Sequence, residues 1–165
     1  MTACSKTSSP SGGIAQALSL AREFVGSEKF VVILGDNVIE DNLKSAVENF
    51  SGGAKIFLKE VENPQAYGVA KVDGDKIISI EEKPKNPKSA LAVIGVYVYE
   101  AGVFEVIDGL KPSGRGELEI TDVNNYYLKG GRLNYELLKG FWGDCGESFD
   151  SLMKAAEMVK GSRLA

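Results

Sequence analysis

The chain has 165 residues, 44% of them hydrophobic and 25% charged, which suits a single globular domain with a sizeable core. Its formal net charge is −4 and it contains no long basic run, so the composition argues against nonspecific binding to nucleic acid. No apolar stretch approaches the ~18–20 residues of a membrane span, and the N-terminus lacks the apolar segment of a secretory signal. We therefore expect neither a membrane nor a nucleic acid as partner.

The cysteine and histidine content narrows the chemistry further. Cys4 and Cys145 are too few and too far apart for a disulfide framework, so a reduced cytoplasm is the simplest setting. Histidine is absent, which excludes imidazole base catalysis and histidine metal ligands. Any metal is then expected to be a hard cation held by oxygen atoms.

The first half of the chain alternates helical and extended patterns. Residues 1–12 are rich in Ser, Thr and Gly and predict a loose leader, and we expect residues 13–165 to form a single domain. Apolar residues at helical spacing predict a helix over 14–25 that Gly26 ends. The expected elements that follow are a strand over 30–34 buried on both faces, a helix over 42–50, a strand over 55–61, and a hairpin of strands 68–72 and 76–82 around Asp73-Gly74.

The second half opens with a strongly apolar run, residues 91–99, that predicts another buried strand. The elements expected after it are a helix over 103–110, a helix over 120–128 capped by Thr121 or Asp122 and ended by Gly130-Gly131, a strand over 133–138, a glycine-rich turn at 141–146, and a final helix capped by Asp150 or Ser151. The alternation predicts an α/β fold with a mixed, mainly parallel central sheet flanked by helices.

Two aspartates follow strands at glycines. Asp36 comes after the strand at 30–34 and Gly35, and Asp144 comes after Gly143. In α/β sheets, ligands collect outside the carboxyl ends of strands, so the two carboxylates could hold a divalent cation that phosphate oxygens and waters complete. The alternative is that they are independent turn aspartates, since Asp and Gly favour turns for local reasons.

Three further segments combine polar groups with turn residues. In Glu82-Lys83-Pro84, the glutamate can accept hydrogen bonds from sugar hydroxyls and the lysine can neutralise a phosphate, although a charged loop is the simpler reading. In Tyr67-Gly68, the glycine would admit a ligand close to the backbone, or it simply starts a strand. The segment 115–122 mixes charges with a helix start, and local capping explains most of it.

Taken in order, these segments resemble the sugar-phosphate nucleotidyltransferase family, and within it the glucose-1-phosphate thymidylyltransferases. The long block Arg-Gly-Glu-Leu-Glu-Ile-Thr-Asp is the most specific of them. The matching segments are Gly-Ile-Ala-Gln-Ala (13–17), Leu-Gly-Asp-Asn (34–37), Tyr-Gly-Val (67–69), Glu-Glu-Lys-Pro (81–84), Val-Ile-Gly-Val-Tyr (93–97), Arg-Gly-Glu-Leu-Glu-Ile-Thr-Asp-Val-Asn (115–124) and Phe-Trp-Gly-Asp-Cys-Gly (141–146).

The resemblance implies a reaction and a role for individual positions. The reaction joins glucose 1-phosphate to dTTP and gives dTDP-glucose and pyrophosphate, with Mg²⁺ as cofactor and with a sugar phosphate and a nucleoside triphosphate as partners. The implied roles are metal binding for Asp36 and Asp144, sugar-phosphate binding for Tyr67, Gly68, Glu82, Lys83 and Val93, and nucleotide binding for Gly13, with Asn37 and Trp142 as secondary candidates.

The chain also departs from the family pattern. The family opens with a strand and a glycine-rich loop that grips the triphosphate, and residues 1–12 do not resemble them. Cys145 and Glu147-Ser148 replace a small β-branched residue and Thr-Pro. We therefore expect an N-terminally truncated, Rossmann-like nucleotidyltransferase fold with impaired activity, whose exposed sheet edge favours a homo-oligomer. The alternatives are a non-catalytic sugar-phosphate or nucleotide-sugar binding and assembly module, and a nucleotidyltransferase that uses UTP or CTP.

Overall fold

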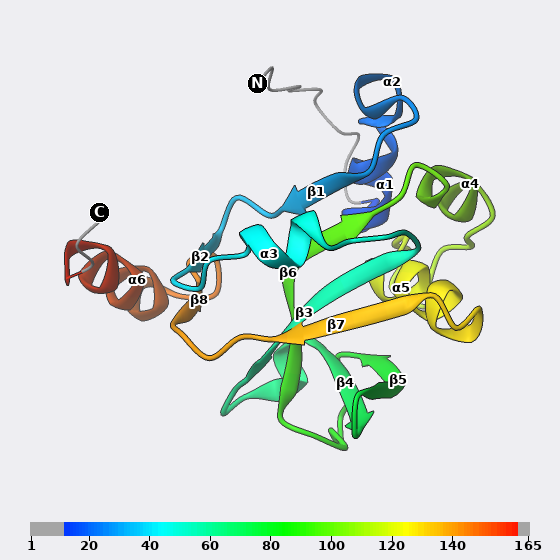
Figure 1. The fold of residues 1–165 in the computed structure, drawn as a ribbon. Helices are drawn as coiled ribbons and strands as arrows, with labels where there is room; N and C mark the ends of the chain where they lie inside the picture. The colour runs from blue at the N-terminus through cyan, green and yellow to red at the C-terminus, as the bar shows by residue number, and fades with distance from the viewer. Residues whose placement is uncertain (1–11, 162–165) are drawn as a thin grey trace.

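The computed structural model describes residues 12–161, which form a curled central sheet with helices on its two faces (Figure 1). The expected leader over residues 1–12 lies outside the described residues except for Gly12. The elements of the sheet are β1 (Phe30–Ile33), β3 (Ala54–Glu60), β4 (Gly68–Asp73), β5 (Lys76–Glu82), β6 (Leu91–Tyr99) and β7 (Leu133–Leu137).

Strand β6 is the centre of this sheet. It pairs antiparallel with β3 along one edge, and along the other edge it pairs with both β1 and β4. Since β1 pairs with the second half of β6 and β4 with its first half, β1 and β4 lie end to end. The strand order is β5-β4-β6-β3-β7, with β1 beside β6.

The sheet is mixed, as expected, but the prediction that it is mainly parallel is wrong for the described strands. Only the β3–β7 pair is parallel among the pairings between residues 12 and 161. The reason is that β6 returns through the middle of the sheet after the β4–β5 hairpin, so it runs opposite to every neighbour. The order of the elements along the chain does not show that β6 inserts between β4 and β3.

A second, two-stranded ribbon lies beside the main sheet. It joins β2 (Asn37–Ile39) to β8 (Trp142–Asp144) in antiparallel register, with Asn37 opposite Asp144. The sequence predicted turns at both places, because strands this short carry no recognisable apolar pattern. The ribbon brings the two aspartate-bearing segments, which are distant in sequence, to one place.

The helices match the expected pattern with changes at their ends. The predicted helix over 14–25 is two helices that break at Leu20 and Ala21. Thr121 and Asp122 both lie inside their helix and neither caps it. Ser148, rather than Asp150 or Ser151, caps the last helix by accepting from the Ser151 N–H at 3.0 Å. The helices are α1 (Gly13–Ser19), α2 (Arg22–Val25), α3 (Lys44–Glu48), the 3₁₀ turn η1 (Pro64–Ala66), α4 (Val103–Asp108), α5 (Ile120–Lys129) and α6 (Phe149–Gly161).

The core lies on both faces of β6. Val93, Tyr97 and Tyr99 pack with α1, α4 and α5 on one face, and Ile94, Val96 and Val98 pack with α3 on the other. Burial on both faces explains why the sequence of β6 is a nearly continuous apolar run. The prediction that the strand over 30–34 is buried on both faces was wrong for β1. Val31 and Ile33 are 38% and 59% exposed, and only the alternate residues of β1 face the core.

The longest described helix, α6, has 13 residues, and within residues 12–161 no helix combines the length and apolar character needed to cross a membrane.

Candidate functional site

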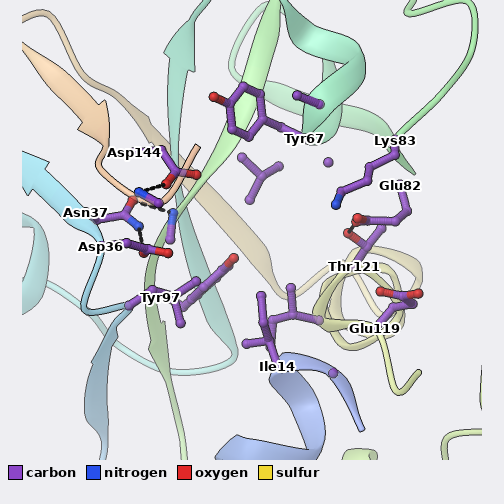
Figure 2. A pocket seen from close by; sticks show the side chains of 18 of the residues that line it. Ile14, Asp36, Asn37, Tyr67, Glu82, Lys83, Tyr97, Glu119, Thr121 and Asp144 are labelled. Carbon is purple, nitrogen blue, oxygen red and sulfur yellow. Dashed lines mark hydrogen bonds between the residues drawn. The ribbon is translucent and has the colours of Figure 1, made fainter. Parts of the chain in front are cut away.

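One pocket of about 550 Å³ opens between the end of β5, the first turn of α1 and the β2–β8 ribbon. Figure 2 shows Asp36, Asn37 and Asp144 on one side of it and Glu82 and Lys83 on the other, with Tyr97 and Ile14 below. The structure brings together every site residue that the sequence singled out. These are Gly13, Asp36, Asn37, Tyr67, Gly68, Glu82, Lys83, Val93, Trp142 and Asp144. Their individual roles stay predictions.

The acidic wall of the pocket consists of Asp36 and Asp144. The loop after β8 folds against the turn before β2, and the Cys145 N–H donates to the Asp36 carbonyl at 2.7 Å. Both carboxylates converge over Gly146, where a Cβ atom would lie 3.1 Å from Asp36 Oδ2 and 3.3 Å from Asp144 Oδ1. A side chain at position 146 would therefore occupy the space between the two carboxylates.

Asn37 fixes the orientation of Asp36. Its Oδ1 accepts from the Gly95 N–H at 3.0 Å and from Trp142 Nε1 at 2.7 Å, while its Nδ2 donates to Asp36 Oδ1 at 2.7 Å. A Cβ on Gly95 would lie only 2.5 Å from Asn37 Nδ2, so this strand position requires glycine. The amide thus ties Asp36 to the central strand β6.

The electrostatics of the acidic wall favour a cation. Burial raises the pKa of Asp144, and the charges of Asp36 and Glu147 add to this effect, while N–H groups of the following loop oppose it. No Lys or Arg within residues 12–161 forms an ion pair with Asp36 or Asp144. Two uncompensated carboxylates that face an open pocket suit a hard divalent cation.

The acidic wall alone does not complete a metal site. No group of three or more Asp, Glu, Cys or His side chains in the described part of the chain is placed to hold a metal. The donor set fits Mg²⁺, which usually keeps several waters and takes one or two carboxylates together with substrate phosphates. Asp36 and Asp144 are the residues that could hold it.

The opposite wall carries Glu82 and Lys83. Thr121 Oγ1 donates a hydrogen bond to Glu82 Oε2, and Lys83 adopts a φ of 40°, which is unusual for a residue with a side chain. The Lys83 N–H donates to the Tyr67 carbonyl at 3.0 Å and holds this bend. Position 68 is also tight, because a Cβ on Gly68 would lie 3.1 Å from Thr121 Oγ1 and 3.4 Å from Glu82 Oε2.

The segment 115–122 lines the pocket, and its N-cap residue Glu119 makes no side-chain capping hydrogen bond, so the prediction that local capping explains most of this segment was wrong. Arg115 forms two hydrogen bonds with the Glu119 carboxylate, at 2.8 and 3.0 Å, and also approaches Glu82 at 3.5 Å. Ser113 Oγ donates to Glu119 at 2.7 Å. The Arg115 hydrogen bonds lower the pKa of Glu119 despite its burial. Residues 115–119 precede α5 and are not helical, so the pairing of Arg115 with Glu119 has no periodic signal in the sequence.

The floor of the pocket combines β6 with the start of α1. Gly13 has a φ of 79°, and a Cβ there would lie 2.5 Å from the Leu118 carbonyl oxygen, so a side chain does not fit. Tyr97 directs its hydroxyl into the pocket (Figure 2). Burial raises the Tyr97 pKa, and the charges of Glu82 and Asp36 raise it further. Tyr97 was not predicted as a site residue, although it shares a strand face with Val93.

Comparison with known proteins identifies the family. A family model described as nucleotidyl transferase matches residues 2–161. The chain is 44% identical over 155 residues to a glucose-1-phosphate thymidylyltransferase of Mycolicibacterium smegmatis, a match that covers 90% of this chain and 53% of the relative. It is 41% identical over 156 residues to a protein of the same name from Neisseria meningitidis, with 90% and 54% covered.

Solved structures agree with this result. A Bacillus anthracis protein assigned as a glucose-1-phosphate thymidylyltransferase, in complex with a sucrose, superposes with a TM-score of 0.89 at 48% identity over 97% of this chain and 66% of its own. A UDP-glucose pyrophosphorylase complexed with UDP-glucose superposes with a TM-score of 0.78 at 27% identity, covering 92% and 64%. The predicted nucleotidyltransferase fold is thus confirmed. The chain spans about half the length of the curated relatives it matches. It belongs to the nucleotidyl transferase family.

Proposed function

We propose that this chain carries the site of a glucose-1-phosphate thymidylyltransferase, which joins glucose 1-phosphate to dTTP and releases pyrophosphate. The observation that carries the proposal is the arrangement of one pocket, in which Asp36 and Asp144 face Glu82 and Lys83. The acidic pair suits a cation bound to phosphates, and the second wall offers a carboxylate for hydroxyls and an ammonium for a phosphate. The names of the curated relatives support this reaction.

The residues of the second wall would bind the sugar phosphate. Lys83 is a mobile point charge that neutralises the sugar's phosphate group. Glu82 has one oxygen engaged by Thr121, and its other oxygen, which lies 3.5 Å from Arg115, accepts a hydrogen bond from a sugar hydroxyl. Val93 supplies an apolar surface beneath the ring, and Gly68 leaves space for Thr121 and Glu82 to approach the backbone.

The reaction itself needs positioning more than proton transfer. An oxygen of the sugar phosphate attacks the α-phosphorus of the triphosphate, a new P–O bond forms, and the bond to the departing pyrophosphate breaks with its electron pair. Mg²⁺ held by Asp36 and Asp144 would supply positive charge for the phosphate oxygens. The protein holds the two phosphate groups in line and compensates the charge that develops.

The test is pyrophosphate release by the purified protein with glucose 1-phosphate, dTTP and Mg²⁺. We expect Asp36→Asn and Asp144→Asn each to lower turnover by about 100-fold or more, the usual effect of removing one electrostatic element of a site. Asp150→Asn, the same change on an exposed aspartate of α6, is the matched control and should keep wild-type turnover. Equal turnover in all four proteins would refute the proposal.

The nucleotide substrate has more than one candidate. The structural similarity to a UDP-glucose pyrophosphorylase favours UTP as the second candidate, and CTP is the remaining alternative. Parallel assays with dTTP, UTP and CTP decide among them by the ratio of kcat/KM values. Calorimetric binding of glucose 1-phosphate or dTDP-glucose without any turnover would instead favour a non-catalytic binding module.

A further inference from the structure

Tyr67 connects the two walls of the pocket. On one side, its carbonyl accepts from the Lys83 N–H at 3.0 Å. On the other side, its hydroxyl donates to Glu147 Oε2 at 2.8 Å, across a separation of 80 residues. Figure 2 shows the Tyr67 ring over the pocket with its hydroxyl turned toward the Asp144 side. The backbone and the side chain of one residue therefore hold opposite walls.

The aromatic ring of Tyr67 is fixed by a second contact. It packs against Trp142 in a T-shaped arrangement, with ring centroids 5.3 Å apart and an interplanar angle of 71°. Trp142 in turn donates to Asn37, which holds Asp36. Burial and the hydrogen bond to Glu147 raise the pKa of the Tyr67 hydroxyl, so this hydroxyl keeps its proton and remains a donor at neutral pH.

Glu147 lies on the loop after β8 and lines the same pocket. Its side chain is exposed, and within residues 12–161 it forms no ion pair with Lys or Arg. Its hydrogen bond with Tyr67 is therefore its main link to the opposite wall.

We propose that Tyr67 and Glu147 form a clasp that sets the separation of the two pocket walls, and that Glu147 is a positioning residue for sugar-phosphate binding. The second part of this proposal rests on the proposed function. Glu147 acts through Tyr67 and need not touch the ligand. Breaking the clasp frees the aromatic ring and lets the loop after β8 move away from Lys83, which weakens ligand binding more than it slows the chemical step.

The first experiment needs no ligand, because Trp142 is the one tryptophan of the sequence and reports on the ring beside it. We expect Glu147→Ala to expose Trp142 to water, which shifts its emission to longer wavelength and increases quenching by acrylamide. Glu147→Gln keeps an oxygen acceptor for the Tyr67 hydroxyl and should restore the wild-type spectrum. Glu157→Ala, on the exposed face of α6, is the matched control.

The coupling between the two residues provides a stricter test. In a Tyr67→Phe background, which retains the ring but lacks the hydroxyl, Glu147→Ala should change neither the emission nor the quenching further. If Glu147→Ala leaves Trp142 unchanged in the wild-type background, the clasp does not exist. If Glu147→Gln behaves like Glu147→Ala, the charge of Glu147 matters and its role as acceptor is refuted.

The second experiment measures calorimetric binding of glucose 1-phosphate to the same variants. We expect Glu147→Ala to weaken binding by about three- to tenfold, the effect of one hydrogen bond to a charged group at a partly exposed position. In turnover assays the change should lie in KM rather than in kcat. A wild-type protein that binds no glucose 1-phosphate refutes the proposed function and the positioning role, while the fluorescence of Trp142 still decides whether the clasp exists. Unchanged binding in Glu147→Ala overturns the positioning role.

Discussion

The two walls of the pocket handle charge in opposite ways. On the wall that carries Glu82 and Lys83, Arg115 binds Glu119 and approaches Glu82, so that most of the charge is compensated within the protein. On the wall that carries Asp36 and Asp144, no ion pair involves either carboxylate in the described part of the chain. The first wall is therefore balanced within the protein, whereas the second leaves two carboxylates without a compensating charge.

The two walls also differ in the hydrogen bonds that hold their side chains in place. The compensated wall is held by side-chain hydrogen bonds around the buried carboxylate of Glu119. The acidic wall is held by the neutral amide of Asn37 and by backbone N–H groups, which orient the carboxylates without neutralising them. Neutral support preserves the negative charge that a metal ion requires.

The largest effect on stability is expected where the acidic wall meets the central strand. Gly95→Ala would place a Cβ 2.5 Å from Asn37 Nδ2, so the amide must move and lose its bond to the Gly95 N–H. We expect the free energy of unfolding to fall by about 2–3 kcal/mol, the upper range for overpacking a filled site. Urea denaturation measures this change.

Two controls separate this collision from a general loss of glycine. A Cβ on Gly35 would meet nothing within 4 Å, and Gly35 lacks the positive φ that demands glycine, so Gly35→Ala should change stability little. In an Asn37→Ala background the collision is absent, and Gly95→Ala should cost much less. An equal cost in both backgrounds would show that Asn37 is not the residue displaced.

The two walls also differ in how much of their structure could be predicted from the sequence. Strand β6 could be predicted within its observed bounds because its apolar run is continuous, and Asp36 and Asp144, which the ordered motifs grouped, line one pocket. The β2–β8 ribbon could not be predicted, since each strand has three residues and its partner is distant in sequence. The segment 115–122 was assigned to helix capping because charges beside a helix start are typical of a cap, whereas in the structure Arg115 and Glu119 pair with each other and line the pocket.

On the compensated wall, Glu119→Gln should remove the charge that pairs with Arg115. We expect a loss of about 1–2 kcal/mol, because Glu119 is buried while Arg115 is partly exposed and its contribution is screened. The Arg115 hydrogen bonds lower the Glu119 pKa, so the stabilisation is present above the ordinary value of 4.5 and is lost as pH falls through the lowered value. Urea denaturation across acidic pH tests this.

The acid dependence provides the control for this prediction. The wild-type protein and Glu119→Gln should differ most at neutral pH and converge in acid, where Glu119 of the wild type becomes protonated. A difference that stays constant from neutral to acidic pH would mean that packing, rather than charge, accounts for the loss.

A smaller gain is expected at Lys83, whose φ of 40° strains any residue with a Cβ. Lys83→Gly removes this strain, and the greater chain entropy of unfolded glycine offsets part of the gain, so stability should rise by about 0.5–1 kcal/mol. Lys83→Ala keeps the strain and should show no such gain. Both variants lose the ammonium group and should bind glucose 1-phosphate more weakly by calorimetry. Equal stability of the two variants would contradict a strained Lys83.

The smallest expected change in stability is at Asp144 on the acidic wall, where the direction of the change is more informative than its size. Burial and the neighbouring carboxylates raise the Asp144 pKa, so its ionisation lowers stability as pH rises through that value. Asp144→Asn should therefore raise stability at neutral pH by about 0.5 kcal/mol, and the gain should vanish in acid. Thermal unfolding with added Mg²⁺ completes the test, because a cation that binds the folded state should stabilise the wild type more than the variant. Equal responses to Mg²⁺ would show that Asp144 does not contribute to cation binding, and a variant less stable than the wild type at neutral pH would contradict the destabilising ionisation of Asp144.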